Sequence, residues 1–257
     1  MKTITGFEKK GKQIWITVGE SSFSVEPEMI IKYHLRSGLE MEDSSYQALI
    51  HENQYLECLR LAYTKLKKML SIFEMKTILS NTSYPIGIQK QVIHHLMEKK
   101  YLDDLSYAKV FLELKKFKEG PEMIKYHLEQ KGISLDIING MFQHYQEDSI
   151  VKELIEKKLS TPSKKPKRAW IQQVKQQLLA KGFHREVIEK TLISAENHIQ
   201  DQDQTIIHTY GSKILRQYQN KLSGYALYQK IKEKLYQKGF NYEDIKRYLE
   251  TIDLQSW

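Results

Sequence analysis

Two hydrophobic patterns follow one another along this chain. In residues 3–25, β-branched and aromatic positions gather in short runs such as residues 14–18, and Gly19 opens the polar break before the next run, which predicts a β-hairpin. From about residue 54 onward, apolar positions recur every three or four residues, the spacing of one face of an α-helix. The pattern therefore predicts a mainly α-helical protein with a small N-terminal extension, residues 1–54, that holds a β-hairpin and short helices.

The most regular stretch spans residues 92–133 and reads as three helices joined by two corners. Asp103 or Asp104 lies where the N-cap of the middle helix is expected, because a carboxylate there accepts the free N–H groups of the first turn. Gly120-Pro121 ends this helix and begins the next, since glycine tolerates a left-handed turn and proline suits a first helical turn. The middle helix is predicted to bury Leu105, Ala108, Phe111 and Leu112.

A Lys-Gly corner followed by an apolar residue recurs at Gly132, Gly182 and Gly239, with a leucine four residues before each glycine. These glycines are 50 and 57 residues apart, a spacing typical of stacked supersecondary units. It predicts three tandem three-helix repeats that form an elongated, curved molecule. In the first repeat, Ser71 and Glu74 have the spacing of a capping box. The predicted boundaries are residues 55–101 for the first repeat, 102–160 for the second, and 161–257 for a third, basic region that contains the last two Lys-Gly copies.

The stretch around the first Lys-Gly corner resembles the core signature of the RecX family. The resemblance rests on landmarks that occur in order: Tyr101-Leu102-Asp103-Asp104, Tyr107-Ala108, Gly120-Pro121, Ile124, Leu128 and Lys131-Gly132-Ile133. It implies a fold of tandem three-helix units and a non-enzymatic regulator of the RecA recombinase. Such a protein would bind the RecA filament on single-stranded DNA and limit its recombinase, co-protease and ATP-hydrolysis activities in recombination and DNA repair.

The net charge of +8 is concentrated in the C-terminal half of the chain. Residues 152–190 hold 11 Lys or Arg against four Glu, and residues 205–247 hold nine against three acidic residues. This imbalance suggests a polyanionic partner, although a solvated helical surface explains part of it. The candidate contact residues are Lys164, Lys165, Lys167, Arg168, Lys175, Lys181, Arg185, Arg216, Lys230 and Lys234.

Two of these features have alternative interpretations. The dense basic run over residues 163–168, followed by Trp170, is either a solvated linker or a contact for phosphates or an acidic partner. The tyrosines that alternate with cations further on either stack bases or pack between helices; they are Tyr210, Tyr218, Tyr225, Tyr228 and Tyr236. A nucleic-acid-binding helical repeat protein that acts without RecA therefore remains the alternative function.

No pattern in the sequence is typical of catalysis, metal binding or nucleotide binding. Asp103 and Asp104 have no accompanying cluster of acids or histidines, and capping explains them. His94 and His95 are helix neighbours that point about 100° apart. Cys58 is the single cysteine, which excludes an internal disulfide and predicts a small buried residue. Because no apolar run suits a signal peptide or a membrane span, we expect a cytoplasmic protein. We also expect a monomer without a cofactor.

Overall fold

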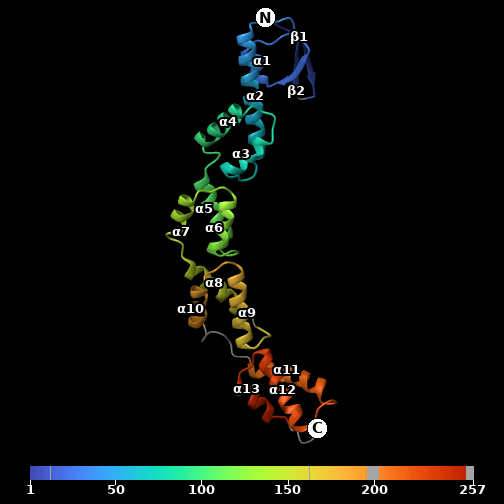
Figure 1. Ribbon diagram of the computed structural model, residues 1–257, viewed down its shortest axis with the longest axis vertical. Helices are drawn as coiled ribbons and strands as arrows, with labels where there is room; N and C mark the ends of the chain where they lie inside the picture. The colour runs from blue at the N-terminus through green and yellow to red at the C-terminus, as the bar shows by residue number, and fades with distance from the viewer. Residues whose placement is uncertain (12, 162, 196–202, 253–257) are drawn as a thin grey trace. The chain divides into compact units, whose positions relative to one another are not determined.

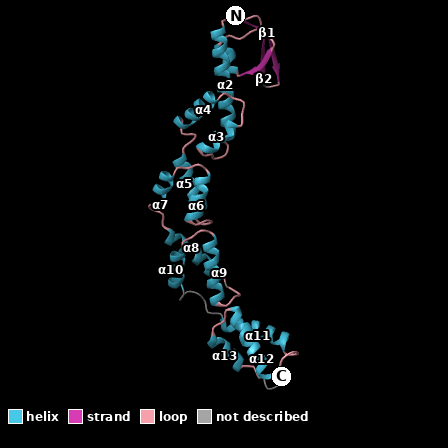
Figure 2. Ribbon diagram, in the orientation of Figure 1, coloured by secondary structure: helices cyan, strands magenta, loops and turns pink. Residues whose placement is uncertain are grey.

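The computed structural model describes residues 1–11, 13–161, 163–195 and 203–252. It confirms a mainly α-helical protein with a small β region at the N-terminal end (Figures 1 and 2). Contacts between Cα atoms divide the chain into two compact units. The first compact unit consists of residues 1–111 and 128–140, and the second of residues 112–127 and 141–257.

Among the described residues, four strands form one antiparallel sheet in the order β3-β2-β1-β4. Strands β2 (Gln13–Val18) and β3 (Ser21–Val25) form the predicted hairpin, in which Ile16 lies opposite Phe23. Strand β1 (Lys2–Lys10) pairs with the other edge of β2, and β4 (Glu40–Met41) pairs with β1. The hairpin thus belongs to a larger sheet, which supports it because two isolated strands are only marginally stable.

Two helices share a buried cluster with this sheet. Helix α1 (Pro27–Lys32) contributes Met29 and helix α2 (Asp43–Lys65) contributes Leu49, which lie in one core with Ile4 and Ile16. Helix α2 continues past this core, and its Cys58 belongs to the next buried cluster. The predicted boundary at residue 54 therefore falls inside one continuous helix that serves both cores.

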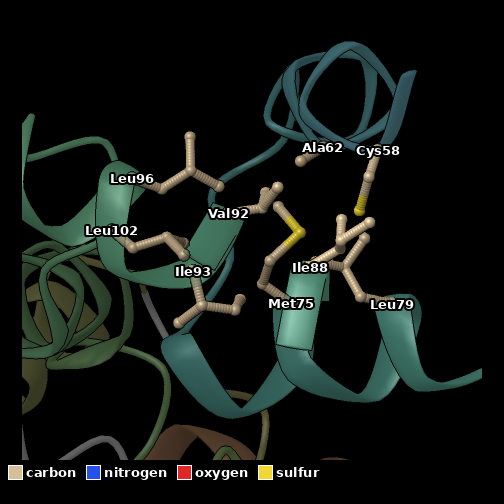
Figure 3. Packing of buried hydrophobic residues seen from close by; sticks show 9 residues of the cluster. All are labelled: Cys58, Ala62, Met75, Leu79, Ile88, Val92, Ile93, Leu96 and Leu102. Atoms are coloured by element: carbon tan, nitrogen blue, oxygen red, sulfur yellow. The ribbon is translucent and has the colours of Figure 1, made fainter. Parts of the chain in front are cut away.

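The second cluster lies between α2, α3 (Ile72–Ser80) and α4 (Ile86–Glu98) (Figure 3). Cys58 is fully buried there, as predicted, and burial raises the pKa of its thiol to about 11. The helical spacing of Val92, Ile93 and Leu96 predicts an apolar face for α4, and this face is confirmed. Its buried side chains are Ile88, Val92, Ile93 and Leu96.

Helices α5 (Asp104–Lys115), α6 (Pro121–Gln130) and α7 (Leu135–Phe142) follow. The prediction that α5 buries Leu105 is wrong, because this side chain is 43% exposed whereas Tyr107 and Ala108 are buried. Leu105 lies two residues before Tyr107, about 200° around the helix, so both cannot face the same side. Phe111 and Leu112 are half-buried.

The second compact unit contains two further groups of three helices, each with its own core. Helices α8 (Glu147–Leu159), α9 (Lys167–Ala180) and α10 (Arg185–Ala195) share one buried cluster. Helices α11 (Asp203–Tyr218), α12 (Gly224–Lys238) and α13 (Tyr242–Glu250) share another. The predicted boundary at residue 160 lies between α8 and α9, whose buried side chains belong to the same core.

Candidate functional site

The two neighbouring aspartates of the Tyr-Leu-Asp-Asp motif cap two different helices. Asp103 is the N-cap of α5, since its Oδ1 accepts the N–H groups of Leu105 at 3.0 Å and Ser106 at 3.2 Å. The hydrogen bond from Ser106 lowers the pKa of Asp103, although partial burial opposes the shift, and Lys100 adds to the lowering. Asp103 therefore has the capping role that the sequence predicts for one member of the pair.

Asp104 reaches a helix that begins 32 residues earlier. Its Oδ1 accepts the N–H of Ile72, the first residue of α3, at 2.9 Å. Burial raises the pKa of Asp104, and the hydrogen bond from Ile72 opposes the shift. The pair thus joins the start of α5 to the start of α3 inside the first compact unit.

Other motif residues surround the same end of α3. Ser71 and Glu74 form the predicted capping box, with both reciprocal hydrogen bonds at 3.1 Å. The ammonium of Lys131 donates to Glu74 at 2.5 Å, and the Ser71 hydroxyl donates to the Lys131 carbonyl at 2.7 Å. Burial opposes ionisation of Glu74, but its bonds to Lys131, the Ser71 backbone and Tyr107 together lower its pKa. These polar side chains therefore hold the junction between α3, α5 and the end of α6.

The Lys-Gly corners contact the first turn of a middle helix from the preceding group. Gly132, Gly182 and Gly239 have φ angles of 73°, 86° and 100°, in the left-handed region that the corner prediction requires. A Cβ on Gly132 would lie 2.4 Å from Cβ of Phe73, and one on Gly182 would lie 2.6 Å from Cγ of Met123. Each glycine is therefore needed both for its backbone conformation and for a close approach.

A second junction, inside the second compact unit, joins the start of α6 to the α8–α10 group. Gly120 donates its N–H to the Lys181 carbonyl at 2.6 Å. Glu147, the first residue of α8, accepts from the backbone N–H of His184 at 2.7 Å and pairs with its Nδ1 at 2.6 Å. Glu147 has the same helix position as Asp104 but a different partner, because Pro121 begins α6 and has no N–H to donate.

A third junction repeats the arrangement of the first. Asp203, the first residue of α11, accepts the N–H of Lys167, the first residue of α9, at 2.8 Å. Gly239 lies beside Ala169, with a hypothetical Cβ 3.0 Å from Cβ of that residue. The motif residues are thus positioned at junctions between helices, where they contribute to architecture.

A basic hollow in the second compact unit brings together part of the predicted cationic surface. Lys164 and Lys165 line it, and they are joined by Lys157 and Lys158 from the last turn of α8. Trp170 forms part of its wall. None of the described residues that line the hollow carries a carboxylate. Sequence analysis missed the α8 lysines, although their place shortly before the basic run was a visible signal.

The remaining cationic candidates are not gathered into that hollow. Lys175 is paired with Glu189, and Lys230 donates to Glu233 at 2.8 Å. Lys181 contributes its carbonyl to the second junction, and Arg185 and Arg216 are exposed. Three others lie near or on the α11–α13 group: Lys167 bonds to Asp203, Arg168 lies over the Tyr236 ring, and Lys234 donates to Gln237.

The tyrosines of the C-terminal region fall into two classes. Tyr210, Tyr218 and Tyr228 pack against the core of α11–α13, which supports the packing interpretation for them. Tyr225 and Tyr236 are 76% and 57% exposed, so packing does not explain these two.

The described part of the chain shows no group of three or more His, Cys, Asp or Glu side chains placed to hold a metal ion. Within the same residues, no helix combines the length and the hydropathy needed to cross a membrane.

Comparison with known proteins identifies several similar chains. Residues 200–249, which include α11, α12 and all but the last residue of α13, match the family model described as "RecX, third three-helix domain". "Regulatory protein RecX" of Halalkalibacterium halodurans is 32% identical over 89% of this chain and 88% of its own. That of Oceanobacillus iheyensis is 31% identical over 89% and 86%. A crystal structure of regulatory protein RecX covers 74% of this chain and 98% of its own with a TM-score of 0.52 at 22% identity, which supports the fold.

Proposed function

Because this chain belongs to the RecX family of regulatory proteins, we propose that it regulates the RecA recombinase by binding the RecA filament on single-stranded DNA. Bound there, it inhibits strand exchange, co-protease activity and ATP hydrolysis, and so modulates recombination and DNA repair in the bacterial cytoplasm. It acts as a monomer, by binding rather than by catalysis.

The observation that carries this proposal is the basic hollow. Four lysines line it from two segments of the chain, Lys157-Lys158 and Lys164-Lys165, without a carboxylate among the described lining residues. Like charges held together repel one another, so such a grouping favours an anionic partner. A filament of RecA on DNA offers phosphates and acidic side chains, and either satisfies this hollow.

A purely structural role for the same lysines is to cap the C-terminal end of α8. Cations near the last turn of a helix interact favourably with its free carbonyl groups, which accounts for Lys157 and Lys158. It does not account for Lys164 and Lys165, which lie in the segment between α8 and α9 and are exposed. The functional interpretation therefore rests mainly on that second pair.

The test is the rate of ATP hydrolysis by RecA on single-stranded DNA with increasing amounts of this protein. We expect wild type to inhibit, and the variant with Lys157, Lys158, Lys164 and Lys165 all changed to Glu to inhibit far less. A matched control reverses the same number of charges at exposed lysines of the first compact unit, Lys65, Lys67, Lys68 and Lys90. Equal loss in both variants would indicate a net-charge effect and not a site.

The alternative, nucleic-acid binding without RecA, is separated by measuring binding to naked single-stranded DNA in the same salt. Phosphate contacts make affinity fall steeply with salt, and each lost contact removes about one unit of the log–log slope. Tight binding without RecA, together with no effect on ATP hydrolysis, would favour the alternative.

A further inference from the structure

Two exposed tyrosines line one hollow on the α12–α13 surface. Tyr236 near the end of α12 and Tyr242 at the start of α13 are 57% and 59% exposed. They form its walls together with Lys232 and two glutamines, Gln229 and Gln237. This tyrosine hollow has a volume of about 290 Å³, near the lower end of the range of about 300–1,000 Å³ for small-ligand sites, which suits a single flat group.

Packing does not explain why these rings lie at the surface. The other tyrosines of this region that contact the α11–α13 core, such as Tyr210 and Tyr228, are partly buried in it. Tyr236 and Tyr242 are absent from that buried cluster and its partly buried neighbours. More than half of the surface of each of these two side chains is therefore open to a partner.

A cation lies over each of the two rings. The Arg168 guanidinium is 5.8 Å from the centre of the Tyr236 ring, and the Lys232 ammonium is 4.9 Å from the centre of the Tyr242 ring. The carboxylate that also lines the hollow, Glu233, is occupied by Lys230 at 2.8 Å and by the Gln237 amide at 2.8 Å. The ring faces are thus flanked by positive charge, and the local negative charge is paired.

We propose that the tyrosine hollow stacks a base of single-stranded nucleic acid, while Arg168 and Lys232 contact the adjacent phosphates. Aromatic rings interleaved with cations are the arrangement that binds unpaired strands, because every base has a π-face and every nucleotide has a phosphate. An acidic protein segment would satisfy the cations but would leave the two rings without a partner. The proposal deepens the function given above, because it makes the bases of the strand a direct ligand of this chain.

The test compares the binding of fluorescently labelled oligothymidine with that of an abasic strand of equal length, so that the phosphates match and only the bases differ. We expect the full-length protein to bind oligothymidine about tenfold more tightly, the effect of roughly one stacked base. In the Y236A/Y242A variant this preference disappears, while affinity for the abasic strand is unchanged. The Y236F/Y242F variant keeps the rings and retains the preference.

Three results would overturn the proposal. They are equal affinity of wild type for the two strands, equal loss on both strands in Y236A/Y242A, and loss of the preference in the phenylalanine variant. Because both side chains are exposed, the melting temperature of each variant should match that of wild type, which separates a binding effect from misfolding. Inhibition of RecA by wild type without strand discrimination would overturn the tyrosine hollow and leave the proposed function standing. Discrimination between the two strands without inhibition of RecA would support the tyrosine hollow and overturn the proposed function.

Discussion

The start of α3 and the start of α6 are held by different chemistry, although both begin the middle helix of a group of three. At α3, Asp104 accepts the free N–H of Ile72, and a serine hydroxyl bonds the next Lys-Gly corner. At α6, the backbone of Gly120 bonds directly to the carbonyl of Lys181. A side-chain cap thus holds the start of α3, whereas at the start of α6 one backbone bonds directly to another, next to a contact between His184 Nε2 and Glu122 Oε1 at 3.4 Å.

The difference follows from one residue type. Pro121 has no N–H, so an acid at the first position of the following helix has nothing to accept from it, and Glu147 bonds to His184 instead. Lys167 begins α9 with an N–H, and there the acid, Asp203, again accepts it. Which partner the acid takes is therefore decided by whether the earlier helix leaves a donor free.

The largest effect is expected where the two backbones meet. A Cβ on Gly120 would lie 2.2 Å from the carbonyl carbon of Gly182, and backbone atoms cannot move aside as a side chain can. We expect Gly120→Ala to reduce the free energy of unfolding by about 3 kcal/mol, measured by denaturant unfolding. Gly140→Ala is the matched control. Nothing lies within 4 Å of its Cβ, so this change within α7 should stabilise by about 0.5 kcal/mol. Equal stability of the two variants would contradict the close approach.

The next largest effects on stability are expected from removing the acids, and they should differ between the two junctions. Glu147→Ala deletes two hydrogen bonds at a position that is 8% exposed and leaves the His184 N–H unsatisfied, so we expect a loss of about 2–3 kcal/mol. Asp104→Ala deletes one bond from a backbone N–H, and we expect about 1–2 kcal/mol. The assigned partners would be wrong if His184→Ala, which keeps its N–H, cost as much as Glu147→Ala.

A double-mutant cycle tests the role of the free donor. Ile72→Pro removes the N–H that Asp104 accepts, so Asp104→Ala should cost about 1 kcal/mol less in that background than in wild type. Pro121→Ala restores a backbone N–H at residue 121 for Glu147 to accept, so Glu147→Ala should cost more in that background than in wild type. Additive behaviour in the first cycle, seen by chemical denaturation, would contradict the assignment of Asp104 as a cap of α3.

The smallest effect concerns pH. The contributions of Asp103 and Asp104 to stability should change in opposite directions as the pH rises. The pKa of Asp103 is lowered by the Ser106 N–H, so its carboxylate stabilises the fold above its ordinary pKa and this is lost as pH falls through the lowered value. The pKa of Asp104 is raised by burial, so its contribution is greatest below the ordinary value and is lost as pH rises through the raised one.

Stability of Asp103→Asn and Asp104→Asn relative to wild type, followed between acid and neutral pH, checks this difference. The penalty of the first should grow with pH, and that of the second should shrink, each by less than about 1 kcal/mol. Parallel pH profiles of the two variants would show that the pair shares one environment.

The sequence by itself determined the features that depend on a few neighbouring residues. Helical spacing predicted the buried face of α4, and the capping box at Ser71 and Glu74 was predicted from two residues three apart. The left-handed corner at Gly132 and its two copies followed from local backbone preference. These features are local because φ angles, caps and helical faces are set within one turn of chain.

Only the tertiary structure decided which distant groups meet. It assigned Asp103 to its own helix and Asp104 to α3, a choice that two adjacent identical residues could not reveal. It also turned Leu105 to the surface and brought Lys157 beside Lys164. The physical reason is that capping side chains and cations interact with the N–H and carbonyl groups that remain free at helix ends. Which of these ends meet is decided by the packing of one helix group against the next.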